Sequence, residues 1–109
     1  MAYDYAGMVA LADPTRRKVF ELVAEGPRSV ANLARTLPVS QPAISHHLKV
    51  LKEARLVRAE PRGASNIYHV DPHGLGEMRA WLDEMWGNAL DAFRNEINKA
   101  KGRNDDGDH

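Results

Sequence analysis

The spacing of apolar residues predicts an amphipathic helix over residues 40–57. When this stretch is plotted as a helix at about 100° per residue, Ile44, Leu48 and Leu51 fall within one narrow arc. The opposite side holds short polar side chains, a histidine and two lysines: Gln41, Ser45, His46, Lys49 and Lys52. The pattern indicates a helix that buries an aliphatic stripe and exposes hydrogen-bonding groups and positive charge.

Capping residues and prolines predict three helices upstream of this one. The first covers the alanine-rich stretch Tyr3–Ala12, and Asp13–Pro14 then caps and begins the second. Gly26–Pro27 ends the second helix, and Ser29 caps a third helix over Val30–Thr36.

A short turn joins this third helix to the helix over 40–57, and Ser40 is placed to cap the latter. Two helices linked in this way form a helix-turn-helix, whose second helix enters the major groove of DNA. Small polar side chains can reach base edges there, while lysines neutralise phosphates. The pattern therefore predicts a DNA-binding face on the helix over 40–57.

Beyond the helix-turn-helix, the apolar period changes from that of a helix to that of strands. Val57–Arg62 and Asn66–Val70 flank Gly63-Ala64-Ser65, which predicts a β-hairpin with a three-residue turn. Tyr68 and Val70 are expected to share its inward face. We therefore expect a mainly α fold with a small β-hairpin wing, an α+β winged helix-turn-helix.

A long amphipathic helix is predicted after Asp71–Pro72, which repeats the cap and proline of the second helix. Its apolar residues lie within about 60° of one line: Leu75, Met78, Leu82, Met85, Trp86, Ala89, Phe93 and Ile97. A helix of about 25 residues is about 38 Å long, longer than a domain of this size is wide. We expect part of the stripe to extend beyond the chain's own core and to pair with a second copy, with the Tyr3–Ala12 helix alongside.

The composition fits one domain over residues 1–101, followed by an acidic tail over 102–109 that we expect to be disordered. Of the 109 residues, 43% are hydrophobic and 28% are charged. The chain has no cysteine, which excludes disulfides, thiolate metal sites and thiol redox switching. No apolar run reaches the roughly 20 residues of a membrane span, and the N-terminus lacks the pattern of a signal peptide, so we expect a cytoplasmic protein.

The net charge of zero conceals an uneven distribution. Residues 28–69 hold seven Lys and Arg against two Glu, a net charge of +5, whereas residues 70–109 carry −4 and residues 1–27 carry −1. The seven are Arg28, Arg35, Lys49, Lys52, Arg55, Arg58 and Arg62. A basic run alone is often a solvated surface, but beside a helix-turn-helix it indicates a surface for a polyanion.

Three motifs, in order and in spacing, resemble the ArsR-type winged-helix repressors of bacteria, in particular the SdpR-like subgroup. ALADPTRRKVFELV (Ala10–Val23) resembles the family's second helix, and SQPAISHHLKVLKEARLV (Ser40–Val57) resembles its recognition helix. EPRGASNIYHVDP (Glu60–Pro72) resembles its hairpin wing and the entry to its last helix. The resemblance covers residues 10–90 and implies a homodimer that represses transcription from an operator of two inverted half-sites.

The resemblance also implies that the first and last helices form the dimer interface, in agreement with the long apolar stripe. The residues expected there are Tyr5, Val9, Leu82, Met85, Trp86, Ala89 and Phe93. The chain departs from the family pattern in two places. Where many relatives carry metal-sensing cysteines it has Asn32, Leu33 and Ala34, and where Ala-Gly-Leu is common it has Ala54-Arg55-Leu56. Either Arg55 adopts the helix-ending conformation that glycine adopts freely, or the helix end differs slightly from that of the family.

We expect the recognition helix and the wing to divide the work of DNA binding. Gln41, Ser45 and His46 are predicted to read base edges, and the amide of Gln41 suits adenine. The remaining contacts, to phosphates or to the minor groove, are expected from Ser40, Lys49, Arg58, Arg62, Ser65 and Asn66. The alternative is a winged-helix module whose basic face binds an acidic protein partner, which the acid-poor face of the recognition helix disfavours.

The sequence gives little support to a metal site, a cofactor or catalysis. Asp71 and His73 resemble part of a zinc site of some relatives, but zinc needs three or four ligands and we assemble no such set. We expect Asp71 to be a helix cap, and we expect no cofactor. Ser45 and His46 lack a positioned acid, so we expect no enzyme activity. The sequence identifies no inducer.

Two further histidines are assigned to structure rather than to chemistry. His47 lies at the flank of the apolar arc of its helix, so we expect it to be partly buried. His69 alternates with Tyr68 and Val70, so we expect it to face outward.

Overall fold

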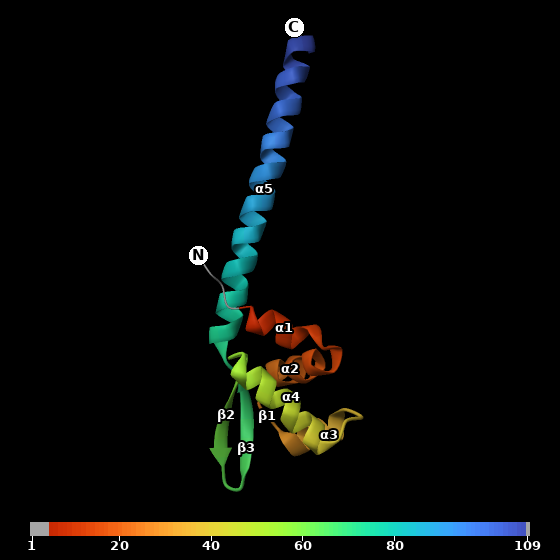
Figure 1. The fold of residues 1–109 in the computed structure, drawn as a ribbon, viewed down its shortest axis with the longest axis vertical. Coiled ribbons are helices and arrows are strands. Elements are labelled where there is room, and N and C mark those ends of the chain that lie inside the picture. The colour runs from red at the N-terminus through yellow and green to blue at the C-terminus, as the bar shows by residue number, and fades with distance from the viewer. Residues whose placement is uncertain (1–4, 109) are drawn as a thin grey trace. The chain divides into compact units, whose positions relative to one another are not determined.

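The computed structural model describes residues 5–108, with their side chains as far as Lys101. The elements follow the order α1-α2-β1-α3-α4-β2-β3-α5 (Figure 1). The chain divides into two compact units, Met1–Met78 and Arg79–His109. Tyr3, the predicted start of the first helix, lies outside the described residues.

The four helices of the first unit correspond to the four predicted ones, but the helix predicted over residues 40–57 ends at Glu53, because the chain turns at Arg55 and continues as a strand from Val57. α1 covers Ala6–Ala12, α2 covers Pro14–Glu25, α3 covers Val30–Thr36 and α4 covers Gln41–Glu53. The helix-turn-helix therefore consists of α3 and α4.

The three predicted N-caps of α2, α3 and α4 are confirmed. In each, a side-chain oxygen accepts a hydrogen bond from the amide three residues later, which has no partner within the helix. The pairs are Asp13 with Arg16 at 3.0 Å, Ser29 with Asn32 at 3.1 Å and Ser40 with Ala43 at 3.3 Å. Because these contacts are local, the sequence alone was enough to place the helix starts.

The strands form one antiparallel sheet in the order β1-β3-β2. β2 covers Val57–Arg62 and β3 covers Ser65–Val70, while β1 consists of Arg28–Ser29 alone. β1 was not predicted, because two residues are too few to show an alternating pattern. It places Arg28 opposite Tyr68 of β3 and so joins the wing to the chain just before α3.

The hairpin turn is one residue shorter than predicted. Arg62 pairs directly with Ser65, so Gly63 and Ala64 alone form the turn. Gly63 has a φ of 61°, and a positive φ at the first of two central residues is typical of a type II′ turn. The twist of this turn suits the twist of the adjoining strands, and Ser65 therefore belongs to β3.

The core of the first unit gathers the apolar sides of α2, α3 and α4 and the start of β2. Its largest fully buried side chains are Val19, Val23, Leu33, Ile44, Leu48, Leu51, Leu56 and Val57. Tyr68 and Val70 pack against this core, as predicted. Complete burial of the apolar stripe of α4 turns the polar face of that helix to solvent.

α5 covers Pro72–Asp108, and its first turn is fixed to the turn that follows α4. The amide of Gly74 donates to the carbonyl of Arg55 at 2.8 Å, and a Cβ on Gly74 would lie 2.5 Å from that oxygen. A residue larger than glycine would force the two segments apart. Arg55 has a φ of 59°, so it adopts the helix-ending conformation that glycine adopts freely.

The second unit is the part of α5 from Arg79 onward. Its residues up to Lys101 are exposed except for Trp81, which is half-buried. α5 ends at Asp108, beyond the predicted domain boundary at 101. The side chains of 102–108 and the whole of His109 lie outside the described part, so the disordered tail stays a prediction. None of the described helices combines the length and the apolar composition that crossing a membrane requires.

Candidate nucleic-acid interface

The exposed face of α4 carries the residues that the sequence assigned to DNA. Gln41, Ser45, His46 and Lys49 are all exposed, whereas Ile44, Leu48 and Leu51 of the same helix are fully buried. Ser40 is exposed at the start of the helix, where its oxygen accepts from the amide of Ala43. Its hydroxyl hydrogen stays available to an outside acceptor, because capping uses only a lone pair.

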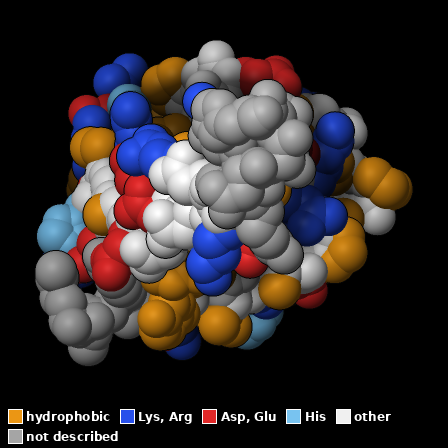
Figure 2. Space-filling model, turned by 90° about the horizontal axis from the view of Figure 1, so that it is seen from above, with side chains coloured by type: hydrophobic (Ala, Val, Ile, Leu, Met, Phe, Trp, Pro, Cys, Tyr) orange, Lys and Arg blue, Asp and Glu red, His pale blue; other side chains and the backbone are white. Residues whose placement is uncertain are grey.

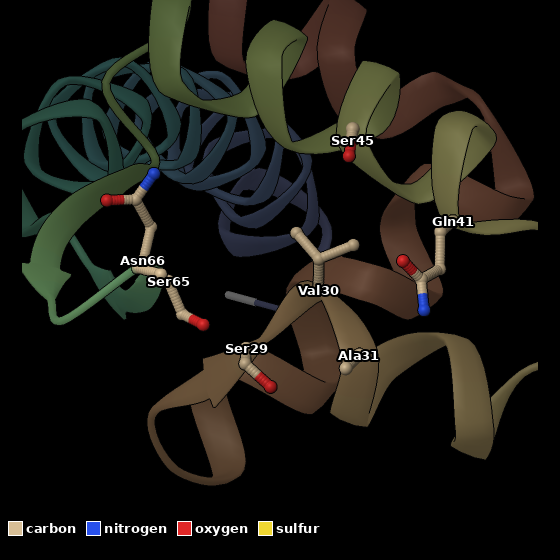
Figure 3. A pocket seen from close by; sticks show the side chains of 8 residues that line it. Ser29, Val30, Ala31, Gln41, Ser45, Ser65 and Asn66 are labelled. Carbon is tan, nitrogen blue, oxygen red and sulfur yellow. The ribbon is translucent and has the colours of Figure 1, made fainter.

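A pocket of about 350 Å³ joins this face to the tip of the wing (Figure 3). It is lined by three segments of the chain: Ser29, Val30 and Ala31 at the start of α3, Gln41 and Ser45 of α4, and Ala64, Ser65 and Asn66 of the hairpin. Figure 3 shows the α4 side chains and the hairpin side chains on opposite sides, with Val30 between them. Four of the nine predicted DNA contacts thus meet at one opening.

The lining of this pocket contains no charged side chain. Hydroxyl and amide groups there can both donate and accept hydrogen bonds, which suits base edges and sugar–phosphate oxygens alike. The contribution of Ser29, Val30 and Ala31 was missed by the sequence reasoning. Ser29 showed only its role as a cap, and no local pattern indicates that the start of α3 faces the wing.

The wing carries a charged cluster around Glu60. Nη2 of Arg62 and Nε2 of His69 each lie 3.2 Å from Oε1 of Glu60. The hydrogen bond with His69 and the charge of Arg62 hold the pKa of Glu60 below its usual value, against a smaller effect of burial. Arg62 remains largely exposed, and an exposed pair of this kind is weak, so its guanidinium can exchange Glu60 for a phosphate.

His69 lies on the outward face of β3, as predicted, because it pairs with exposed Arg58 whereas Tyr68 and Val70 pack against the core. Its side chain is nevertheless only 23% exposed, because its ring contacts Glu60. The alternation along β3 places Tyr68 and Val70 inward correctly, but the neighbouring strand β2 partly covers the other face through Glu60. A single strand pattern contains no information about that cover.

The seven basic residues of the middle segment do not form one free surface. Arg35, Lys49, Lys52, Arg58 and Arg62 are exposed, whereas Arg28 is engaged with α2 and α3 and Arg55 donates to Nε2 of His73 at 3.0 Å. On the face drawn in Figure 2, Lys and Arg side chains lie among Asp, Glu and apolar side chains. Four of the five exposed basic residues that remain belong to α4 and the wing, and Arg35 belongs to α3.

The partial zinc motif is used within the protein. Oδ1 of Asp71 accepts from the amide of His73 at 2.9 Å, which is the expected cap of α5. His73 contacts the guanidinium of Arg55, and a positive charge so close disfavours a cation. In the part of the chain that the structure describes, no three His, Asp or Glu residues gather where they could hold a metal ion.

His47 is partly buried on the flank of α4, as predicted. Its Nδ1 is buried and has no hydrogen-bond partner among the described residues. Burial lowers the pKa of His47, while the charge of Asp13 acts in the opposite direction and is weaker. The imidazole is therefore kept neutral, which fits a packing residue rather than a phosphate contact.

The residues expected at a dimer interface are exposed in both units. Val9 on α1 and Tyr5 just before its first residue are both exposed. On α5 the exposed apolar residues are Leu82, Met85, Trp86, Ala89, Leu90, Phe93 and Ile97. Leu90 was not included in the predicted stripe, although it lies at its edge. A run of exposed aromatic and aliphatic side chains of this length is typical of a surface that binds a protein.

Comparison with known proteins supports a regulatory role. A family model described as bacterial regulatory protein, arsR family, matches residues 13–59. The chain is 54% identical over 84 residues to the HTH-type transcriptional regulator Rv2034 of Mycobacterium tuberculosis. These 84 residues cover 77% of this chain and 78% of the relative. It is 33% identical to the transcriptional repressor SdpR of Bacillus subtilis, over 67% of this chain and 81% of the relative.

Solved structures with the same fold include two regulators. The crystal structure of a possible transcriptional regulator for arsenical resistance has a TM-score of 0.68 and 40% identity, and the match covers 83% of this chain and 94% of that one. The NMR structure of the homodimeric winged helix-turn-helix DNA-binding domain of Mb0332 from Mycobacterium bovis has a TM-score of 0.61 and 25% identity. That match covers 78% of this chain and 79% of the Mb0332 domain. The predicted winged helix-turn-helix fold is thereby confirmed, and these relatives are regulators rather than enzymes.

Proposed function

The chain belongs to the arsR family of bacterial regulatory proteins, and on that premise we propose that it is a homodimeric repressor that binds an inverted-repeat operator in double-stranded DNA. The observation that carries the proposal is the pocket of Figure 3, where α4 and the wing tip present uncharged donors and acceptors to one opening. α4 is the helix that a helix-turn-helix inserts into the major groove.

In this proposal the first turns of α4 read the sequence. Gln41, Ser45 and His46 face the base edges, and the amide of Gln41 can pair with adenine through two hydrogen bonds. The exposure of all three supports the assignment, because none must leave the core to reach DNA.

The flanking residues hold the sugar–phosphate backbone. Ser40 and Lys49 bind phosphates beside the major groove, and Arg58 and Arg62 do so from the wing. Ser65 and Asn66, at the wing side of the pocket, reach the backbone or the adjacent minor groove. The lower pKa of Glu60 keeps that residue charged, so the net charge of the wing is smaller than its two arginines suggest.

Two copies are needed to cover an inverted repeat. The exposed apolar side chains of α1 and α5 support a homodimer, as does the homodimeric state of the Mycobacterium bovis relative. The predicted interface residues are Tyr5, Val9, Leu82, Met85, Trp86, Ala89 and Phe93. A two-fold dimer with one recognition helix in each of two successive major grooves requires half-sites about 34 to 36 Å apart. The name of the Bacillus subtilis relative favours repression over activation.

The test begins with a duplex selected from a random-sequence pool by the purified wild-type chain. We expect an inverted repeat, bound as a dimer at physiological salt. Gln41→Ala should then bind with relaxed sequence preference, whereas Arg62→Ala should weaken all duplexes alike and reduce the salt slope by about 1.8, about 0.9 for each protomer of the dimer. Failure to select any inverted repeat would refute the repressor proposal and favour an acidic protein partner. If both variants lose sequence preference equally, the assignment of Gln41 to the bases and of Arg62 to the DNA backbone is wrong.

A further inference from the structure

Arg28 lies where α2, α3 and the wing meet. Its backbone pairs with Tyr68 of β3, and the next residue, Ser29, caps α3. Its side chain is only 20% exposed, which is unusual for a residue in the basic part of a DNA-binding chain. A single side chain at this point can affect both halves of the candidate interface.

All three nitrogens of its guanidinium are engaged. Nε donates to the carbonyl of Leu22 at 2.8 Å, one of the carbonyls at the end of α2 that has no partner within the helix. Nη1 donates to Oδ1 of Asn32 in α3, also at 2.8 Å. Nη2 lies 3.3 Å from Oε1 of Glu25, but that carboxylate is exposed and the pair contributes little.

We propose that Arg28 is a positioning residue for DNA recognition, which sets the wing relative to α4; this inference rests on the proposed DNA-binding function. The three residues that follow Arg28 form the part of the pocket between α4 and the wing tip. If the side chain no longer ties the end of α2 to α3, β1 can shift, and the pocket changes its width. The hydrogen-bond donors and acceptors that line the pocket then no longer match the positions of the DNA bases and sugar–phosphate backbone.

The opposite assignment is that Arg28 binds a phosphate directly. Its geometry argues against this, because the side chain is only 20% exposed and two short hydrogen bonds hold Nε and Nη1 inside the protein, which leaves a phosphate only the remaining N–H groups of Nη1 and Nη2. Lysine cannot replace it as a positioning residue, since an ammonium lacks the planar fork that reaches Leu22 and Asn32 at once. Arg28 therefore releases no counterion when DNA binds.

The experiment compares full-length Arg28→Lys, Arg28→Ala and Asn32→Ala with the wild type. Each is titrated by fluorescence anisotropy, over a range of salt, with the selected duplex and with a scrambled duplex. Unfolding curves first establish a temperature at which every variant is folded. Arg58→Ala, an exposed basic residue of the wing, is the matched control for loss of one charge.

We expect Arg28→Lys and Arg28→Ala to lose about tenfold in affinity for the selected duplex, the factor that corresponds to one hydrogen bond of a charged group. Their affinity for the scrambled duplex and their salt slopes should not change. Asn32→Ala, which removes one partner of Arg28, should show a smaller loss of the same kind. Arg58→Ala should weaken both duplexes and lower the salt slope by about 1.8, about 0.9 for each protomer of the dimer.

Three results would overturn the inference. Full affinity in Arg28→Lys, or a lower salt slope in Arg28→Ala, would assign Arg28 to a phosphate. If folded Arg28 variants keep the wild-type ratio of affinities for the selected and the scrambled duplex, Arg28 has a purely structural role. If the wild type itself binds the selected and the scrambled duplex equally well, the proposed function is refuted, and the inference about Arg28 with it.

Discussion

α4 and α5 carry the same kind of apolar stripe, yet the structure buries one and exposes the other. Ile44, Leu48 and Leu51 of α4 are 0% exposed, whereas Trp86 and Phe93 of α5 are 58% and 64% exposed. Both stripes show the 3.6-residue period of an amphipathic helix. The 3.6-residue spacing of apolar residues therefore shows which face of a helix packs against another surface. It does not show whether that surface belongs to the same chain.

The largest effect should come from truncating the buried stripe. Leu48→Ala leaves a cavity in the core of the first unit, and we expect it to lower the free energy of unfolding by about 2 to 5 kcal/mol. Urea denaturation followed by circular dichroism measures this. Leu90→Ala is the matched control on α5, and at low protein concentration it should change the free energy by less than about 0.5 kcal/mol. Similar losses in the two variants would contradict the contrast between the helices.

The exposed stripe should matter for association instead. Trp86→Glu places a charge in the proposed dimer interface, and we expect the dimer dissociation constant to rise at least about thirtyfold. Sedimentation equilibrium measures this directly. Ala80→Glu introduces the same charge on the opposite, exposed side of α5 and should leave association unchanged. If the wild type sediments as a monomer at all concentrations, or if both variants dissociate alike, the stripe does not bind a second copy.

A smaller effect is expected at the start of α4. Ser40→Ala removes the oxygen that caps the amide of Ala43, which should cost about 1 kcal/mol in thermal unfolding. Ser40→Asp should restore most of this stability, because aspartate is an equally good cap. Ser45→Ala, on the exposed face of the same helix, should change stability by less than about 0.5 kcal/mol. A loss in Ser45→Ala as large as that in Ser40→Ala would show that capping is not the cause.

The smallest effect concerns the flank of α4 and depends on pH. Burial lowers the pKa of His47 below its ordinary value of 6.5, so between the folded and unfolded pKa values the unfolded chain binds more protons than the folded one. Stability should therefore be complete above pH 6.5 and should decrease as the pH falls below it. His47→Gln should flatten this dependence between pH 7.5 and 5.5, measured by urea denaturation.

The pKa of Asp13 is also lowered, chiefly by its hydrogen bond from the amide of Arg16. Its contribution is lost in a separate window, as the pH falls below the ordinary carboxyl value of 3.8. If the stability of His47→Gln varies with pH between 7.5 and 5.5 as strongly as that of the wild type, His47 is not the source of that pH dependence.

Sequence reasoning proposed most of the candidate interface because its signals are local. The caps Asp13, Ser29 and Ser40 act within three residues, and the buried arc of α4 implies that its other residues are exposed. The same reasoning missed contacts that cross between elements. It placed His69 on the outward face but did not foresee its partial cover by Glu60 of the neighbouring strand, and it counted Arg28 as surface charge.

The sequence by itself determined the helices, the wing, the apolar stripe of α5 and the polar side chains along α4. These follow from backbone geometry and from the free energy of burying apolar surface, which act over a few residues at a time. Only the tertiary structure decided that β1 joins the wing to α3, that the start of α3 lines the pocket with α4 and the wing tip, and that Arg28 is withdrawn from the basic surface. Those outcomes depend on strand pairing and hydrogen bonds between separate elements, and pairings between β1 and β3 at residues about 40 apart leave no periodic trace in the chain.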